Sequence, residues 1–136
     1  MKTYIVNVSG YYQFDSFSRL NESGVYLVYR QNKNDGRFRL IYIGKADVVS
    51  NRVNEQHNHY QDWLEWAYGD VSALRFSIVT VPEGLSIEDC EAALIYALQP
   101  PINTDGKETY TRNDIEIMFV GRPVCNRKSI IAIRNA

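Results

Sequence analysis

Two charged side chains fall where the sequence pattern predicts an apolar face, and they define the chemistry open to this chain. Glu91 precedes Leu94, Ile95 and Leu98 by three, four and seven residues, so it shares or borders the buried face of a predicted helix. A carboxylate there is unfavourable unless it is paired or binds a metal ion. The alternative is that Glu91 lies at the edge of the apolar stripe and reaches water.

Arg52 stands in a similar position, because it follows Val48 and Val49 by four and three residues. A guanidinium group near a core can bind a phosphate through two parallel hydrogen bonds. The alternative is a side chain that buries its stem and extends its charge into water. His57 and His59, the only histidines, follow in the same segment. Taken alone, they are more often surface residues than catalytic ones.

Tyrosines near glycines form the third candidate group. Tyr42 lies in the run Leu40-Ile41-Tyr42-Ile43-Gly44-Lys45, which predicts a buried strand. A buried phenol needs a hydrogen-bond partner, and Gly44 lets the backbone turn or approach a ligand closely. With Lys45 beside them, these residues make a possible phosphate site. Gly24-Val25-Tyr26 is a similar signal upstream.

The hydrophobic pattern predicts a sheet that could position these residues. A polar turn at residues 31–36, with an Asn/Asp-Gly signal, joins the first two strands as an antiparallel hairpin. The three core strands are expected at 25–29, 38–43 and 74–81. Further strands are expected at 4–8, 115–120 and 130–133.

Capping signals predict the helices. Ser86 begins a capping box, so a helix should run to about Leu98 with a buried stripe of Ile87, Cys90, Leu94 and Leu98. Asp47 is expected to cap a helix from about Val48, and Asp15 a short helix nearer the N-terminus. Whether the helix after Asp47 continues through residues 57–59 stays open, because asparagine and histidine are poor helix formers. Trp63 and Trp66 are expected to pack on the core.

Length and composition set outer bounds. The 136 residues fit one domain, 1–136, and the net charge of −1 argues against strong non-specific binding to nucleic acid. No apolar run approaches a membrane span, and two cysteines without metal-ligand spacing favour free thiols in the cytoplasm. Residues 27–52 nevertheless carry six bases against two acids, whereas residues 53–103 carry one base against eight acids.

Taken together, these residues resemble the GIY-YIG nuclease family. Gly24-Val25-Tyr26 is similar to its first signature, and Tyr42-Ile43-Gly44 is its second. Arg52 falls where the family has its arginine. The run from Glu91 to Asn103, together with Lys45, resembles the incision domain of bacterial excision-repair nucleases. The resemblance covers about residues 23–105, so 1–22 and 106–136 are extensions expected to pack on this core.

The resemblance implies an α+β fold, with a small three-stranded antiparallel sheet flanked by helices and additional strands from both ends of the chain. It also implies hydrolysis of DNA phosphodiester bonds with one divalent metal, Mg²⁺ or Mn²⁺. Glu91 would hold the metal, Arg52 the phosphate, and Tyr42 the attacking water as its general base or its orienter. Tyr26 and His57 would position water or relay a proton, and Asn103 would fix the glutamate helix against the sheet.

One position departs from the family pattern. The family has a His or Tyr about one helical turn after the arginine, where this chain has Gln56. His57 therefore needs an irregular helix to reach the site, and His59 and Tyr60 are the alternatives.

The expected partner is duplex or branched DNA, bound through Arg37, Arg39, Lys45 and Arg52, with a protein partner that supplies targeting as a further possibility. No membrane contact is expected, and the oligomeric state stays open. The alternative function is a catalytically weak or inactive module of the same fold that binds nucleic acid or a protein.

Overall fold

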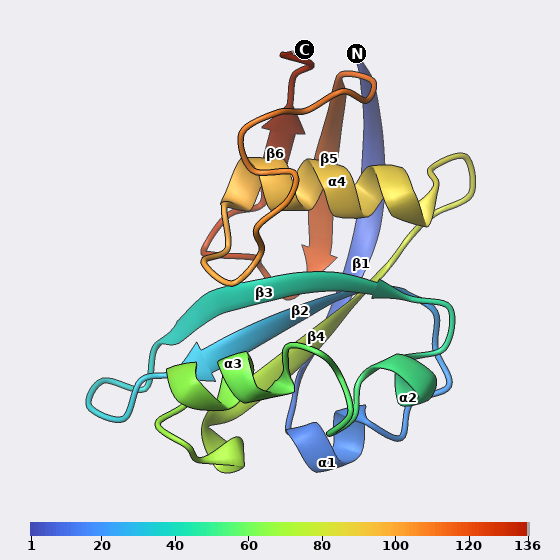
Figure 1. The fold of residues 1–136 in the computed structure, drawn as a ribbon. Helices are drawn as coiled ribbons and strands as arrows, with labels where there is room; N and C mark the ends of the chain where they lie inside the picture. The colour runs from blue at the N-terminus through green and yellow to red at the C-terminus, as the bar shows by residue number, and fades with distance from the viewer. Residues whose placement is uncertain (136) are drawn as a thin grey trace.

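A single sheet of six strands organises the computed structural model, which describes residues 1–135 (Figure 1). Its order is β3-β2-β4-β1-β5-β6, and all neighbours are antiparallel except β1 and β5. The strands are β1 Lys2–Tyr12, β2 Gly24–Gln31, β3 Phe38–Ala46, β4 Leu74–Thr80, β5 Ile115–Gly121 and β6 Ser129–Ala132. All six predicted strands are therefore confirmed, and the α+β class with them.

The predicted hairpin is formed by β2 and β3. Its register pairs Tyr26 with Gly44 and Val28 with Tyr42. The Asn32 side chain accepts hydrogen bonds from the next backbone N–H groups, and Gly36 adopts a left-handed φ of 71°. That conformation carries little steric cost for glycine, so the turn closes where the sequence indicated.

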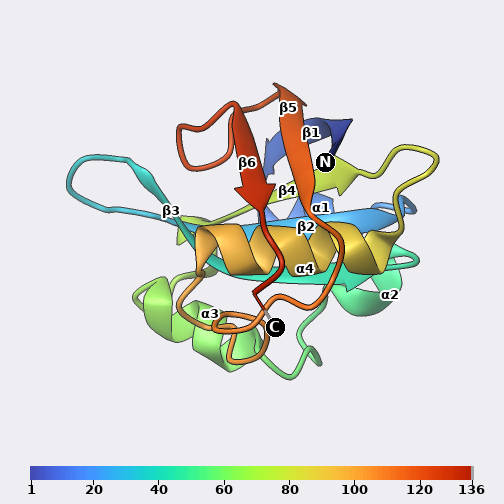
Figure 2. The same cartoon turned by 90° about the horizontal axis from the view of Figure 1, so that it is seen from above.

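Helices cover both faces of the sheet. They are α1 Phe14–Phe17, α2 Val49–Arg52, α3 Tyr60–Trp66, the 3₁₀ turn η1 Val71–Ala73, and α4 Ile87–Leu98. Figure 2 shows α4 lying along one face, with the short helices on the other side of β2 and β3. None of the helices described is long and apolar enough to cross a bilayer.

Of the three predicted caps, only the one at Ser86 forms. Ser86 Oγ accepts the N–H of Asp89 at 3.0 Å, and α4 runs to Leu98 as predicted. The prediction for Asp47 is wrong, because α2 begins at Val49 after an extended Val48 that makes no side-chain cap. The prediction for Asp15 is also wrong: this residue lies inside the first turn of α1 and pairs with Arg19.

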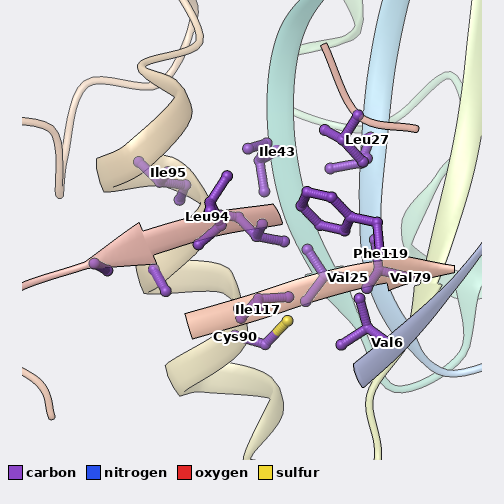
Figure 3. Close-up of a cluster of buried hydrophobic side chains, with 14 of the residues drawn as sticks. Val6, Val25, Leu27, Ile43, Val79, Cys90, Leu94, Ile95, Ile117 and Phe119 are labelled. Atoms are coloured by element: carbon purple, nitrogen blue, oxygen red, sulfur yellow. The ribbon is translucent and has the colours of Figure 1, made fainter. Parts of the chain in front are cut away.

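Two apolar cores lie on opposite faces of the sheet. Cys90 and Leu94 of α4 pack on the first, as predicted (Figure 3). Ile87 and Leu98, also predicted for this face, are only partly buried. Trp63 is fully buried in the second, under β2 and β3, while Trp66 is half-buried. Tyr26 and Tyr42, which belong to the site described below, lie in this second core.

Asn103 covers the free edge of β3. Its Oδ1 accepts the N–H of Ile43 at 2.9 Å, and its Nδ2 donates to the Ile43 carbonyl at 2.9 Å. The N–H of Ile102 also donates to Ile41. The segment after α4 is thereby bonded to the strand that carries Tyr42.

We predict that Asn103→Ala lowers the free energy of unfolding by about 2 to 3 kcal/mol, because both polar groups of Ile43 lose their partner in a partly buried place. Urea unfolding followed by tryptophan fluorescence measures this change. Asn113→Ala removes an exposed amide and is the matched control, with little expected effect. Equal stability of both variants would contradict the proposed anchoring.

Candidate active site

Tyr26 and His57 form the centre of a cluster beneath the β2–β3 hairpin. Tyr26 on β2 is fully buried, and its Oη lies 2.8 Å from Nε2 of His57, itself only 7% exposed. His57 lies in the segment between α2 and α3, where the predicted helix is broken. The sequence did not decide between a continuous and a broken helix at this point. The structure shows a break, and the break brings His57 rather than Gln56 against Tyr26.

Local hydrogen bonds explain the break. Asn54 accepts the N–H of Gln56 through its side chain and the N–H of His57 through its carbonyl. Short polar side chains that bond to nearby backbone compete with helical hydrogen bonding. Residues 53–59 therefore fold as turns, and the side chain of His57 is free to face the sheet.

The hydrogen bonds of His57 also fix its tautomer. The N–H of His59 donates to Nδ1 of His57 at 3.0 Å, so this nitrogen carries no proton. Burial and the nearby Arg52 lower the pKa of His57 to about 4, which keeps the ring neutral at pH 7. Its single proton is then on Nε2 and is donated to Tyr26 Oη. The hydroxyl proton of Tyr26 is left to donate elsewhere.

Tyr42 lies beside Tyr26 in the same cluster. Its ring lies 6.2 Å from the ring of Tyr26 and 4.8 Å from the ring of His59, between centroids. Burial and the charge of Glu91 raise the pKa of the Tyr42 phenol, whereas the charge of Arg52 and a hydrogen bond from Tyr26 lower it. The phenol thus has two groups beside it that favour its ionised form.

Gly44 leaves the space that Tyr26 fills. A Cβ built on Gly44 would overlap Cζ and Oη of the Tyr26 ring. The sequence predicted a close approach at this glycine, and the group that approaches is the other tyrosine. No larger residue fits here without moving Tyr26.

Glu91 reaches the same region from α4. The side chain is half-buried and makes no hydrogen bond or ion pair with any described residue. Burial raises the pKa of Glu91, while Lys45 and Arg52 lower it and Glu88 raises it. A half-buried carboxylate without a partner remains available for a cation.

Lys45 and Arg52 border a surface hollow of about 350 Å³ that Ile87 and Glu88 of α4 close on the other side. Arg52 is exposed, so the expected orientation toward the core is wrong; the core positions of α2 belong to Val49 and the following Val53. Lys45 pairs with Glu88 at 3.3 Å. Glu88 was not predicted as a site residue, although it lies one helical turn before Glu91.

Arg37 and Arg39 are not brought to this cluster. Arg37 lines a separate hollow with Tyr11 and Cys125, and Arg39 lies over the ring of Trp66. Arg37 immediately precedes β3 and Arg39 is its second residue, so both lie at the hairpin end, away from Lys45 near the other end of the strand.

Among residues 1–135, no three or more His, Cys, Asp or Glu side chains gather in a way that could hold a metal ion by themselves. No family model, curated protein or solved structure matches the chain.

We predict that Gly44→Ala destabilises the protein by about 2 kcal/mol, because overfilling a packed site displaces the Tyr26 ring. A double-mutant cycle measured by urea unfolding tests this cause. In a Tyr26→Leu background, which lacks the overlapping ring atoms, the cost of Gly44→Ala should largely disappear. In the matched Tyr26→Phe background the ring remains, and so should the cost; equal costs in both backgrounds would exclude this contact as the reason.

Proposed function

We propose that the chain is a metal-dependent endonuclease of the GIY-YIG type, which hydrolyses DNA phosphodiester bonds. The observation that carries the proposal is the convergence of Tyr26, Tyr42 and His57 next to Arg52, a cation without an ion pair, and Glu91, a carboxylate without a partner. These five residues come from five parts of the fold: β2, β3, α2, the α2–α3 connection and α4. The antiparallel strands β3, β2 and β4, bordered by helices, agree with the fold that the family resemblance implies.

The residues present fit a hard divalent cation such as Mg²⁺ or Mn²⁺. Mg²⁺ in phosphate-processing sites is held by one or two carboxylates, several waters and the substrate itself. Glu91 supplies one unpaired carboxylate, one helical turn after the Glu88 that lines the hollow. A single carboxylate suits Mg²⁺ better than zinc, which requires several protein ligands. When bound, the metal would polarise the phosphate and stabilise the leaving oxygen.

Arg52 binds the scissile phosphate in this proposal. The guanidinium is exposed, forms no ion pair with any described residue, and borders hollows on both sides, one with Lys45 and one with His57. A guanidinium can hold two phosphate oxygens at once and offset charge that develops on them. Lys45 would leave Glu88 and bind a phosphate oxygen when DNA enters the hollow.

Tyr42 is the general base that this geometry supports best. His57 cannot accept a proton through Nε2, which already carries one, and its Nδ1 is occupied by the His59 N–H. His57 instead donates to Tyr26, and Tyr26 donates to Tyr42, so both hold the Tyr42 oxygen in place and favour its ionised form. His57 is thus a positioning residue for the phenol.

The alternative is a module that binds phosphate groups without cleaving them. The Lys45–Glu88 ion pair favours this alternative, because Glu88 already neutralises Lys45, one of the two cations at the hollow. Calorimetric titration with Mn²⁺ separates the two functions: the nuclease should bind Mn²⁺ at millimolar concentrations or below through Glu91, and the binding module should not.

We predict that Glu91→Gln lowers Mg²⁺- or Mn²⁺-dependent nicking of a supercoiled plasmid by about 100-fold or more, since metal stabilisation of a phosphate transition state is worth several kcal/mol. Glu88→Gln is the matched control on the same helix face and should keep most of the activity. Activity that survives Glu91→Gln would disprove the assignment of the metal ligand.

We also predict that the nicking rate rises with pH as Tyr42 loses its proton. Arg52 lowers the pKa of Tyr42, so Arg52→Gln should move the ascending limb of the pH–rate profile to higher pH, in addition to reducing the rate. Tyr26→Phe should move it in the same direction, because it removes a hydrogen bond to the phenolate. Arg19→Gln, in the exposed turn after α1, is the control. An ascending limb that stays at the same pH in both site variants would exclude Tyr42 as the base.

A further inference from the structure

A second group of cations lies at the other end of the β2–β3 hairpin. Arg30 and Arg39 face each other across β2 and β3 in register, and Lys33 lies in the turn between the strands. Two aromatic side chains stand beside them, Trp66 at the end of α3 and Tyr68 just beyond it. We call these five residues the cation–aromatic cluster; Figure 1 shows the hairpin turn and the end of α3 on the same side of the molecule.

Ring contacts hold the cluster together. The guanidinium groups of Arg30 and Arg39 lie 5.5 and 5.1 Å from the centroid of the Trp66 ring. Arg30 lies 5.5 Å from the centroid of Tyr68, and Lys33 Nζ lies 4.7 Å from it. Each cation therefore rests on an aromatic face, which is favourable for guanidinium and ammonium groups.

The arrangement leaves positive charge unbalanced. Arg30, Lys33 and Arg39 form no ion pair with any described residue; Asp70 lies near Lys33, but its carboxylate bonds to Ser72. Like charges directly opposite each other on paired strands are destabilising. Three clustered cations without acids indicate a surface that is completed by an anion from outside the chain.

Tyr68 carries the second, independent indication of a binding role. The residue is 45% exposed and its φ is 61°, in the left-handed region that favours glycine. This conformation ends α3, where the N–H of Gly69 donates to the Leu64 carbonyl at 2.7 Å, and glycine is the usual residue at such a helix end. An exposed ring stands there instead, so this position adds an aromatic face to the surface beside the three cations.

We infer that the cation–aromatic cluster binds single-stranded nucleic acid, with a base stacked on Tyr68 and the phosphates on the three cations. Bases stack on exposed aromatic rings wherever they are unpaired, and cations beside the ring neutralise the strand. Lys33 lies in an exposed turn, so it can leave the ring for a phosphate as a base takes its place. The inference rests on the proposed function. For a nuclease, this surface would make DNA with an unpaired arm the preferred substrate.

Fluorescence anisotropy with a labelled oligothymidylate, in EDTA to prevent cleavage, tests the inference. Tyr68→Gly should weaken binding by about 5-fold or more, the usual loss for one stacked base. Tyr68→Phe keeps the ring and should bind as tightly as the native protein. Because glycine relieves the left-handed strain, Tyr68→Gly should unfold at the same or a higher urea concentration, so weak binding cannot be attributed to poor folding.

Charge is tested separately. Lys33→Gln should weaken binding and reduce its salt dependence, whereas Lys128→Gln, an equal charge change in the β5–β6 connection, should not. A blunt duplex of the same length should lose little affinity in Tyr68→Gly, since its bases are not free to stack. Equal binding of oligothymidylate by Tyr68→Gly and the native chain would overturn the inference, as would tighter Tyr68-dependent binding of a poly-glutamate peptide, which would identify an acidic protein partner instead.

The two proposals fail in different ways. If Tyr68→Gly binds oligothymidylate normally while Glu91→Gln stops nicking, the single-strand inference is wrong and the nuclease stands. If Tyr68→Gly loses binding but no metal-dependent nicking is found in the native chain, the binding surface stands and the proposed activity is wrong.

Discussion

The contact between the Tyr26 ring and the bare backbone of Gly44 is the constraint on which the candidate site depends. Strand register places the two residues opposite each other, and only a glycine leaves room for the ring. With the ring held there, its hydroxyl reaches His57, and Tyr42 lies on the same side, in the second core. Two phenols are thus positioned by paired strands of a hairpin rather than by loops.

The histidine is positioned in the opposite way, by the failure of a helix. A regular helix from Val49 would have directed Gln56 one turn beyond Arg52, toward the place where the site needs a ring. Asn54 ends that helix by bonding to the backbone ahead of it, and the turns that follow bring His57 over Tyr26. The same turns place the His59 N–H on Nδ1, which turns His57 into a donor. Residues that disfavour a helix therefore determine which nitrogen of His57 donates to Tyr26.

The strands and the long helix could be predicted from the sequence because their signals are local: alternation and β-branched runs for the strands, and a capping box at Ser86 for α4. The caps at Asp47 and Asp15 were wrong because a good capping residue forms no cap when the backbone enters the helix elsewhere. The candidate residues Tyr26, Tyr42, Arg52, His57 and Glu91 were named from the sequence, but their geometry could not be. The exposure of Arg52, the Lys45–Glu88 pair and the tautomer of His57 depend on contacts between segments far apart in the chain.

The separation between the two groups of cations constrains how one strand of nucleic acid could use both. Tyr26 and Arg30 lie four residues apart on β2, which corresponds to about 13 Å along a strand. Stacked nucleotides advance about 3.4 Å each, so the span equals about four nucleotides. Under the two proposals, a strand with a base at the cation–aromatic cluster and a phosphate at the Tyr26 end of β2 would have about four nucleotides between them. Since a duplex has no unpaired base to offer at that distance, the preferred cut would lie a few nucleotides from the junction of a paired and an unpaired arm.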